Sequence, residues 1–445
     1  MKIHPNEERL EELLRAAGSD HQALIRHLLR CEPCRERLHR LALAGDAHAE
    51  IPGAPDYGQA FDAASRSVRS QALALAGERR AAAVLFAELA AAPPGSQEDL
   101  LRAERFQTWG FFELLVDRAE ETSLEDPARA QELASLALHV SASLSPRHYR
   151  RELVEDLRTR AWAHLGNARR LVSDLAGAAE AFGAAGEHLR RGTGDPIERA
   201  ILLDREASLE RDLRRFGEAR GSLERAVRIF LRNGENHRAG RSLVNLSLVH
   251  SYAGETEQSI ETLSRALELI DPEQDPRTLL CARHNLAGYL AEAGRYEDAL
   301  DLYRQALPLY GDFPDAWTEN RRQWLLGRIE RGLGRPGAGE QFLRAARDGF
   351  LAEGIPYDTA LVSLDLALLY AEQGRTAELK ELAAGMVPIF ASRHIHREAL
   401  AALGFLQQAI EAETATLDIV TSIADYLRRA QHDPELRWEG VSPEG

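Results

Sequence analysis

The sequence has few cysteines, no excess of positive charge and no long apolar run. Three cysteines in 445 residues are too few for the disulfide framework of a secreted protein, so we expect a reducing cytoplasm. Acidic residues outnumber basic ones by 70 to 55, which gives a net charge of -15 and leaves little basic surface for direct nucleic-acid binding. No stretch reaches the roughly 18–20 apolar residues that cross a membrane, and the acidic, amphipathic N-terminus does not resemble a secretory signal. We therefore predict a cytoplasmic protein that binds neither nucleic acid nor a membrane.

Catalytic motifs are missing as well. The sequence contains no glycine–lysine phosphate loop, no H-E-x-x-H and no G-x-S-x-G. The letters GLGRPG at residues 332–337 match G-x-G-x-x-G, but that motif requires a preceding strand. Here Gly334 falls at a turn between two predicted helices. We predict that the protein is not an enzyme.

What the sequence does contain is a repeat of 40 residues. Glycines mark a turn at this spacing, and two other residues continue the spacing upstream: Gly254, Gly294, Gly334, Gly374, then Arg214 and Asp174. Small residues recur five and twelve positions after each turn: Ala179, Ala219, Ser259 and Ala299, then Ala226, Ala266, Ala306 and Ala346. Leucines recur eight positions before it: Leu246, Leu286, Leu326 and Leu366. Small residues let two antiparallel helices approach closely, and leucines fill the seam between them.

A single helix pair cannot bury its apolar face alone, so neighbouring pairs must stack into an all-α solenoid. The repeated columns resemble the tetratricopeptide repeat, a helical hairpin, over roughly residues 160–395. We predict the following organisation: 1–48 a small helical module, 49–60 a linker, 61–160 a helical region with a degenerate repeat, 161–395 the repeat array, 396–432 C-terminal capping helices and 433–445 a tail.

The resemblance to tetratricopeptide repeats also implies a partner-binding groove, because in that family the first helices of the hairpins line the concave face. Its candidate residues here are Arg241, Asn245, His284, Asn285, Arg321 and Arg328. Asn245 and Asn285 stand where peptide-binding members carry asparagines that hold the ligand backbone. Arginine binds carboxylates bidentately, so Arg241 and Arg321 are suited to acidic groups of a partner. The alternative is that these polar side chains only solvate an exposed surface.

The N-terminal segment HLLRCEPC spells H-x-x-x-C-x-x-C with His27, Cys31 and Cys34. Residues four apart share one side of a helix, and zinc favours four nitrogen or sulfur ligands. We take His4 as the fourth ligand, with His21, His39 or water as alternatives. A redox dithiol and two incidental cysteines are the competing interpretations, but a structural Zn²⁺ suits a module with so small a core.

The motif resembles the zinc-binding anti-sigma factor domain over about residues 1–45, with His4 in place of the upstream ligand. This resemblance implies a bacterial regulator that binds a sigma factor. We therefore predict a non-enzymatic regulatory adaptor, monomeric alone. It would bind a sigma factor or another regulatory protein through the zinc module and a second protein through the groove. The alternative is a generic interaction scaffold of a signalling or defence operon, in which the zinc module is purely structural. Whether the cysteines form a redox switch stays open.

Overall fold

The computed structural model describes residues 5, 10, 28, 31–44, 57–123, 126–145, 148–391 and 417–430. The chain divides into two units, residues 1–74 and 75–445. Helix α3 (Glu32–Ala44) lies in the first unit, and α4 (Tyr57–Ala91) begins there and continues into the second. Of the expected linker, residues 57–60 form the first turn of α4, and the remainder lies outside the described residues. The expected tail and residues 396–416 of the expected cap also lie outside them.

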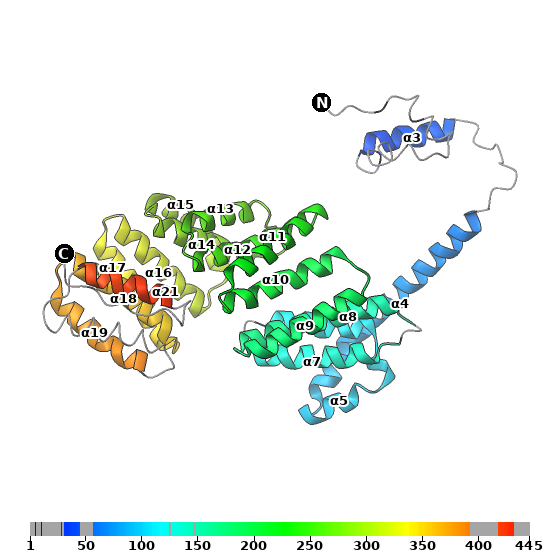
Figure 1. Ribbon diagram of the computed structural model, residues 1–445, viewed down its shortest axis with the longest axis horizontal. Helices are drawn as coiled ribbons and strands as arrows, with labels where there is room; N and C mark the ends of the chain where they lie inside the picture. Colours follow the sequence, from blue (N-terminus) through cyan, green and yellow to red (C-terminus); the bar gives the residue numbers. More distant parts are fainter. Residues whose placement is uncertain are drawn as a thin grey trace. The chain divides into compact units, whose positions relative to one another are not determined.

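The second unit is built from successive helical hairpins that stack on one another along the chain (Figure 1). Short elements precede them: η2 (Pro94–Ser96), α5 (Gln97–Leu100) and η3 (Glu104–Phe106). The hairpins are α6 (Trp109–Thr122) with α7 (Pro127–Ser143), α8 (Arg151–Leu171) with α9 (Leu175–Arg191), α10 (Pro196–Asp212) with α11 (Phe216–Arg232), α12 (Asn236–Tyr252) with α13 (Thr256–Leu267), α14 (Pro276–Glu292) with α15 (Tyr296–Asp312), α16 (Ala316–Gly332) with α17 (Pro336–Ala352) and α18 (Pro356–Glu372) with α19 (Thr376–Ala391). The prediction of an all-α solenoid is confirmed.

The turns inside the hairpins follow the predicted register except in the α8–α9 pair. Gly254, Gly294, Gly334 and Gly374 have φ between 66° and 78°, which is the left-handed conformation that ends a helix and suits glycine. Arg214 occupies it at 62°. In the α8–α9 hairpin the left-handed residue is Ser173, at 65°, and Asp174 instead caps α9 by accepting a hydrogen bond from the backbone N–H of Gly177.

The α8–α9 turn therefore comes one residue earlier than the 40-residue spacing predicts. The buried small residue that follows it is Ala178, whereas Ala179 is exposed. The hydrophobic seam of this hairpin is thus the same as in the others, but it is displaced by one position in the sequence.

The columns of small residues mark the closest helix contacts. Ala226, Ala266, Ala306 and Ala346 are fully buried, and the predicted leucines are buried beside them. In the α16–α17 hairpin, a Cβ atom added to Gly327 would lie 2.7 Å from Cγ of Leu343. No larger side chain fits there unless the two helices separate.

The apolar core runs along the seams between hairpins. A large cluster extends from α10 to α16, and another joins α4 to α9. A third contains α17, α18 and α19 together with α21 (Leu417–Ala430), whose Val420 and Ile423 are fully buried. Figure 1 shows α21 beside α18. Among the described residues, every helix is too short or too polar to span a bilayer.

Candidate functional site

Helices α12, α14, α16 and α18 bring their inner faces to one cavity. Aspartates immediately before α14 and α16 fix where these helices start. Asp275 accepts from the backbone N–H of Thr278 at 2.9 Å, and Asp315 does the same for Thr318. Such caps supply hydrogen-bond acceptors for the backbone N–H groups of the first helical turn, which have no partner within the helix. Arg277 of α14 donates to Asp315 at 2.9 Å, so the two helix starts are also tied to each other.

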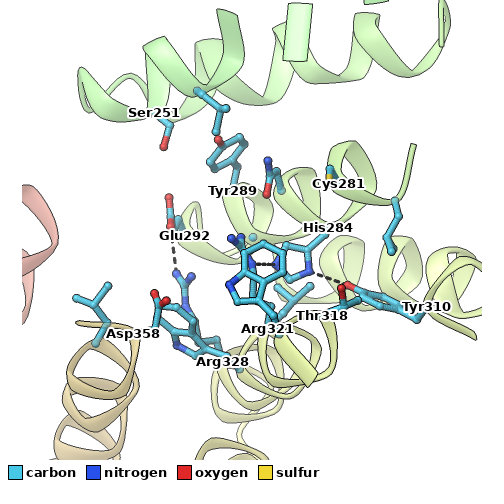
Figure 2. A pocket seen from close by; sticks show the side chains of 18 of the residues that line it. Ser251, Cys281, His284, Tyr289, Glu292, Tyr310, Thr318, Arg321, Arg328 and Asp358 are labelled. Carbon is cyan, nitrogen blue, oxygen red and sulfur yellow. Dashed lines mark hydrogen bonds and ion pairs between the residues drawn. The ribbon is translucent and has the colours of Figure 1, made fainter. Parts of the chain in front are cut away.

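The groove cavity has a volume of about 400 Å³ (Figure 2). Its walls combine leucines with aromatic rings and a few charged groups: Leu248, Leu280, Leu325 and Leu361; Tyr252, Tyr289, Tyr310, Trp317 and Trp324; Arg277, Arg321, Arg328, Glu292 and Asp358. His284 and Asn285 also line it. An apolar cavity with a small number of placed polar groups is typical of a ligand site.

His284 is held as a neutral imidazole in the wall of the cavity. Its Nδ1 lies 2.6 Å from the Tyr310 hydroxyl, and its Nε2 accepts from Nε of Arg321 at 3.4 Å. Burial, reinforced by the charges of Arg321 and Arg328, holds the pKa of His284 well below its ordinary value. Since Nε2 is an acceptor, Nδ1 carries the proton and donates it to the Tyr310 oxygen.

Arg321 is a cation without a carboxylate partner. Its guanidinium lies 4.8 Å from the centre of the Trp317 ring, and Nε is engaged by His284. Within the described part of the chain, no carboxylate oxygen comes within 4.0 Å of this group. Figure 2 shows Arg321 directed into the cavity beside His284. Its two terminal Nη groups therefore remain available to an incoming anion.

The other charges of the cavity are offset internally. Arg328 donates to Glu292 at 3.3 Å and lies 4.0 Å from Asp365, which in turn accepts from the Trp324 indole at 2.6 Å. Burial raises the pKa of Asp358 and the charge of Arg321 opposes this shift, so Asp358 lies within electrostatic range of Arg321 although no ion pair of 4.0 Å or less joins them. Arg321 is thus the cavity arginine without a direct carboxylate contact among the described residues.

Asn285 is the second free polar group. Asn285 lines the cavity, and its side-chain amide makes no hydrogen bond to the residues that the structure describes. An amide offers both a donor and an acceptor, so Asn285 can pair with the backbone of an extended peptide.

The remaining two predicted groove residues, Arg241 and Asn245, do not line the cavity. The Asn245 amide donates to both carboxylate oxygens of Asp204, at 3.2 and 3.3 Å. Arg241 lies 4.0 Å from Glu120 and 3.8 Å from Asp275. The predicted set is therefore divided: His284, Asn285, Arg321 and Arg328 come together, whereas Arg241 and Asn245 face acidic groups of the protein itself.

Sequence reasoning missed the aromatic members of the cavity. Trp317 lies four residues before Arg321, so the spacing of neighbours on one helix face was a signal that could have identified it. Tyr310 comes from α15, the second helix of its hairpin. A search limited to the first helices of the hairpins therefore does not find it. Glu120, which lies 4.0 Å from Arg241 and 3.4 Å from Arg205, comes from the degenerate repeat more than one hundred residues away in the sequence.

In the N-terminal unit, the structure places Cys31 directly before α3 and Cys34 in its first turn. Cys34 is almost fully buried against Leu10 and Leu28, and Cys31 packs against the same cluster. Burial and the neighbouring thiol of Cys31 raise the pKa of Cys34. The other predicted ligands, His4 and His27, lie outside the described residues, as does His21, and only the backbone of His39 is described.

Within the described residues no group of three His, Cys, Asp or Glu side chains is arranged to hold a metal. The thiols of Cys31 and Cys34 interact with each other beside one small apolar core.

The fold defines a helical-repeat protein in which successive first helices line one cavity. Residues 198–271 and 257–312 match the tetratricopeptide repeat family, in agreement with the fold. No curated protein matches this chain.

Among solved structures, the crystal structure of Rap protein complexed with competence and sporulation factor is similar at a TM-score of 0.54. The two chains are 13% identical over 72% of this chain and 87% of that one. The apo form of RapI is 14% identical, with a TM-score of 0.48 over 62% and 97% of the two chains. A signal-transduction ATPase with a tetratricopeptide repeat sensor from Pyrococcus horikoshii is 14% identical, with a TM-score of 0.49 over 74% and 53%. At 13% identity, the likeness to the Rap protein complex establishes the solenoid fold alone.

Proposed function

We propose that this protein is a non-enzymatic adaptor whose groove cavity binds a carboxylate-bearing peptide segment of a partner protein. The observation that carries the proposal is Arg321, a cation that faces a cavity and has no carboxylate partner in the described protein. A charge-assisted hydrogen bond contributes about 1.5–3 kcal/mol, and two parallel bonds from a guanidinium add geometric specificity.

The surroundings of Arg321 support a peptide as the ligand. Asn285 supplies a free amide for the peptide backbone, and the leucine and aromatic walls supply apolar surface for a neighbouring side chain. His284 and Trp317 hold the guanidinium in place, so little conformational entropy is lost when the ligand binds.

A selection from a displayed random peptide library on the full-length protein tests this proposal. We expect enriched peptides to share an acidic side chain or a free C-terminus at a fixed position. Apolar residues should stand beside it, because the cavity walls are largely apolar. Enriched peptides that lack any acidic group would contradict the proposal.

For the N-terminal unit we propose a Zn²⁺ site in which Cys31 and Cys34 are ligands, together with His27 and His4. The contact between the two thiols supports the cysteine half of this set. Bound zinc would supply a covalent staple between α3 and the preceding chain, since a module this small has little apolar core.

Elemental mass spectrometry on purified protein should find about one zinc per chain. The Cys31→Ser/Cys34→Ser variant should lose it, because serine is a poor zinc ligand. The Cys281→Ser variant is the matched control and should keep the metal, since Cys281 lies in the groove cavity. Equal zinc content in all three proteins would exclude the cysteines as ligands.

We further propose that the zinc unit binds a regulatory protein, with a sigma factor as the first candidate. A pull-down of candidate sigma factors by the wild-type protein and by Cys31→Ser/Cys34→Ser separates the two roles of the unit. If the Cys31→Ser/Cys34→Ser variant loses both the metal and the partner, the N-terminal unit recognises that partner. An unchanged partner with a lower Tm would leave the zinc purely structural, and the protein would then be a generic interaction scaffold.

A further inference from the structure

A second depression lies between α9 and α11, with α10 beneath it, and shares no residue with the groove cavity. Its volume is about 520 Å³. The floor is apolar and comes from three helices: Leu189, Leu202, Leu203 and Ile229. Four arginines surround this floor: Arg199, Arg225, Arg228 and Arg232. We call this surface the arginine-rimmed depression.

Three of the four rim arginines, Arg199 on α10 and Arg225 and Arg232 on α11, have no carboxylate oxygen within 4.0 Å among the described residues. Arg225 donates only to the Gly221 carbonyl and the Ser222 hydroxyl. Arg228 has only the exposed Glu224 at 3.8 Å.

Several other arginines on the second helices are paired with carboxylates. Arg220, earlier on α11, contacts Glu255 at 2.7 Å, Arg304 on α15 contacts Asp301 at 3.0 Å and Arg344 on α17 contacts Glu340 at 2.9 Å. A cluster of like charges without counter-charges destabilises a folded protein through self-repulsion. An anionic partner would remove that repulsion.

The carboxyl group within the depression does not neutralise the rim. Glu206 lines it, but no ion pair joins it to the arginines at 4.0 Å or less among the described residues. Burial, with Glu210 beside it and Arg225 opposing, raises the pKa of Glu206 to about 7. At neutral pH Glu206 is therefore less fully ionised than an ordinary glutamate.

We propose that the arginine-rimmed depression docks an acidic amphipathic helix of a partner protein. Arg225, Arg228 and Arg232 follow the i, i+3, i+7 spacing of one helix face and span about 10 Å. Carboxylates at the same spacing on a partner helix match this row. Apolar residues on the same side of that helix then reach the leucine and isoleucine floor, as in other helix-in-groove complexes.

A nucleic acid fits this surface less well. Phosphate backbones are bound by extended basic surfaces, whereas the chain as a whole carries a net charge of -15. The same helix α11 also exposes Glu218 and Glu224 beside the arginines. The row of three arginines is short and borders an apolar floor. This combination suits an amphipathic helix better than a phosphate backbone.

Fluorescence anisotropy with full-length protein tests the proposal. The probe is a labelled helical peptide of about 18 residues, with glutamates along one edge of a leucine face. Its controls are a scrambled peptide of the same composition and a single-stranded DNA oligonucleotide. We expect the amphipathic peptide alone to bind, and more weakly at high salt.

The variant Arg225→Glu/Arg228→Glu/Arg232→Glu should weaken that binding at least about 30-fold, because each substitution replaces an attraction by a repulsion. Arg118→Glu/Arg295→Glu/Arg304→Glu makes the same change of charge at exposed arginines elsewhere and should shift the affinity by less than about 3-fold. Circular dichroism checks that both variants keep their helices.

In the Arg321→Glu variant, which removes the cation proposed to bind acidic peptides in the groove cavity, the probe should still bind the arginine-rimmed depression, because Arg321 lies outside it. Three results would overturn the proposal: no binding of the amphipathic peptide, equal binding of the scrambled peptide or the oligonucleotide, or an equal loss in both triple variants. If Arg321→Glu alone abolishes binding, the peptide occupies the groove cavity, and the depression is not its site.

Discussion

Replacing Phe350 with alanine is expected to lower the free energy of unfolding by about 3–5 kcal/mol. The Phe350 side chain is fully buried on α17 and packs edge-on against Trp324, with ring centroids 6.1 Å apart. Alanine would leave a cavity in the core that α17 shares with α18 and α21. Because Trp324 also lines the groove cavity, the loss should loosen that wall as well.

The adjacent residue provides a matched control. Leu351 is 49% exposed, so Leu351→Ala should change the free energy of unfolding by no more than about 0.5 kcal/mol. In a solenoid each hairpin depends on its nearest neighbours. Hydrogen exchange should therefore show faster exchange in α16, α17 and α18 of the Phe350 variant, with α10 and α11 unchanged. Similar exchange in both variants would mean that Phe350 does not anchor this part of the array.

Reversing the charge at Arg321 is expected to have the largest effect on partner binding. Arg321→Glu removes a charge-assisted contact of about 1.5–3 kcal/mol and adds repulsion against a carboxylate. The affinity for an acidic peptide selected on the wild-type protein should therefore fall at least about 100-fold. Isothermal titration calorimetry with such a peptide measures the change directly.

Two further variants separate charge from geometry. Arg321→Lys keeps the positive charge but loses the planar fork and the stacking on Trp317, so it should bind about 10-fold more weakly than the wild type. Arg304→Glu makes the same change of net charge as Arg321→Glu at an exposed, ion-paired position and should leave binding unchanged. If Arg321→Glu binds the peptide as tightly as the wild type, the groove cavity does not recognise a carboxylate through Arg321.

The repeat architecture was predictable from the sequence because it depends on local spacing. A column of alanines at one helical position can only mark a close helix contact, and the four alanines from Ala226 to Ala346 are indeed fully buried. The α8–α9 hairpin shows that the 40-residue spacing alone does not locate every turn. Its turn comes one residue early, at Ser173, and only the backbone conformation reveals the shift.

Local spacing predicted His27, Cys31 and Cys34 as zinc ligands, and of these the structure describes Cys31 and Cys34 at the start of α3. In the groove, the resemblance to tetratricopeptide repeats implied His284, Asn285, Arg321 and Arg328 as residues of the first helices that face a partner. These residues line one cavity.

Only the tertiary structure decided which polar groups are free to meet a partner. Arg241 and Arg321 have equivalent positions in their repeats, 80 residues apart. Arg241 faces Glu120 and Asp275, however, whereas Arg321 rests on Trp317 and His284. The residue type and the repeat register fix where an arginine stands on its helix. Whether its charge is neutralised depends on side chains that other helices bring from distant parts of the chain, because electrostatic pairing depends on distance in space and not on separation in sequence.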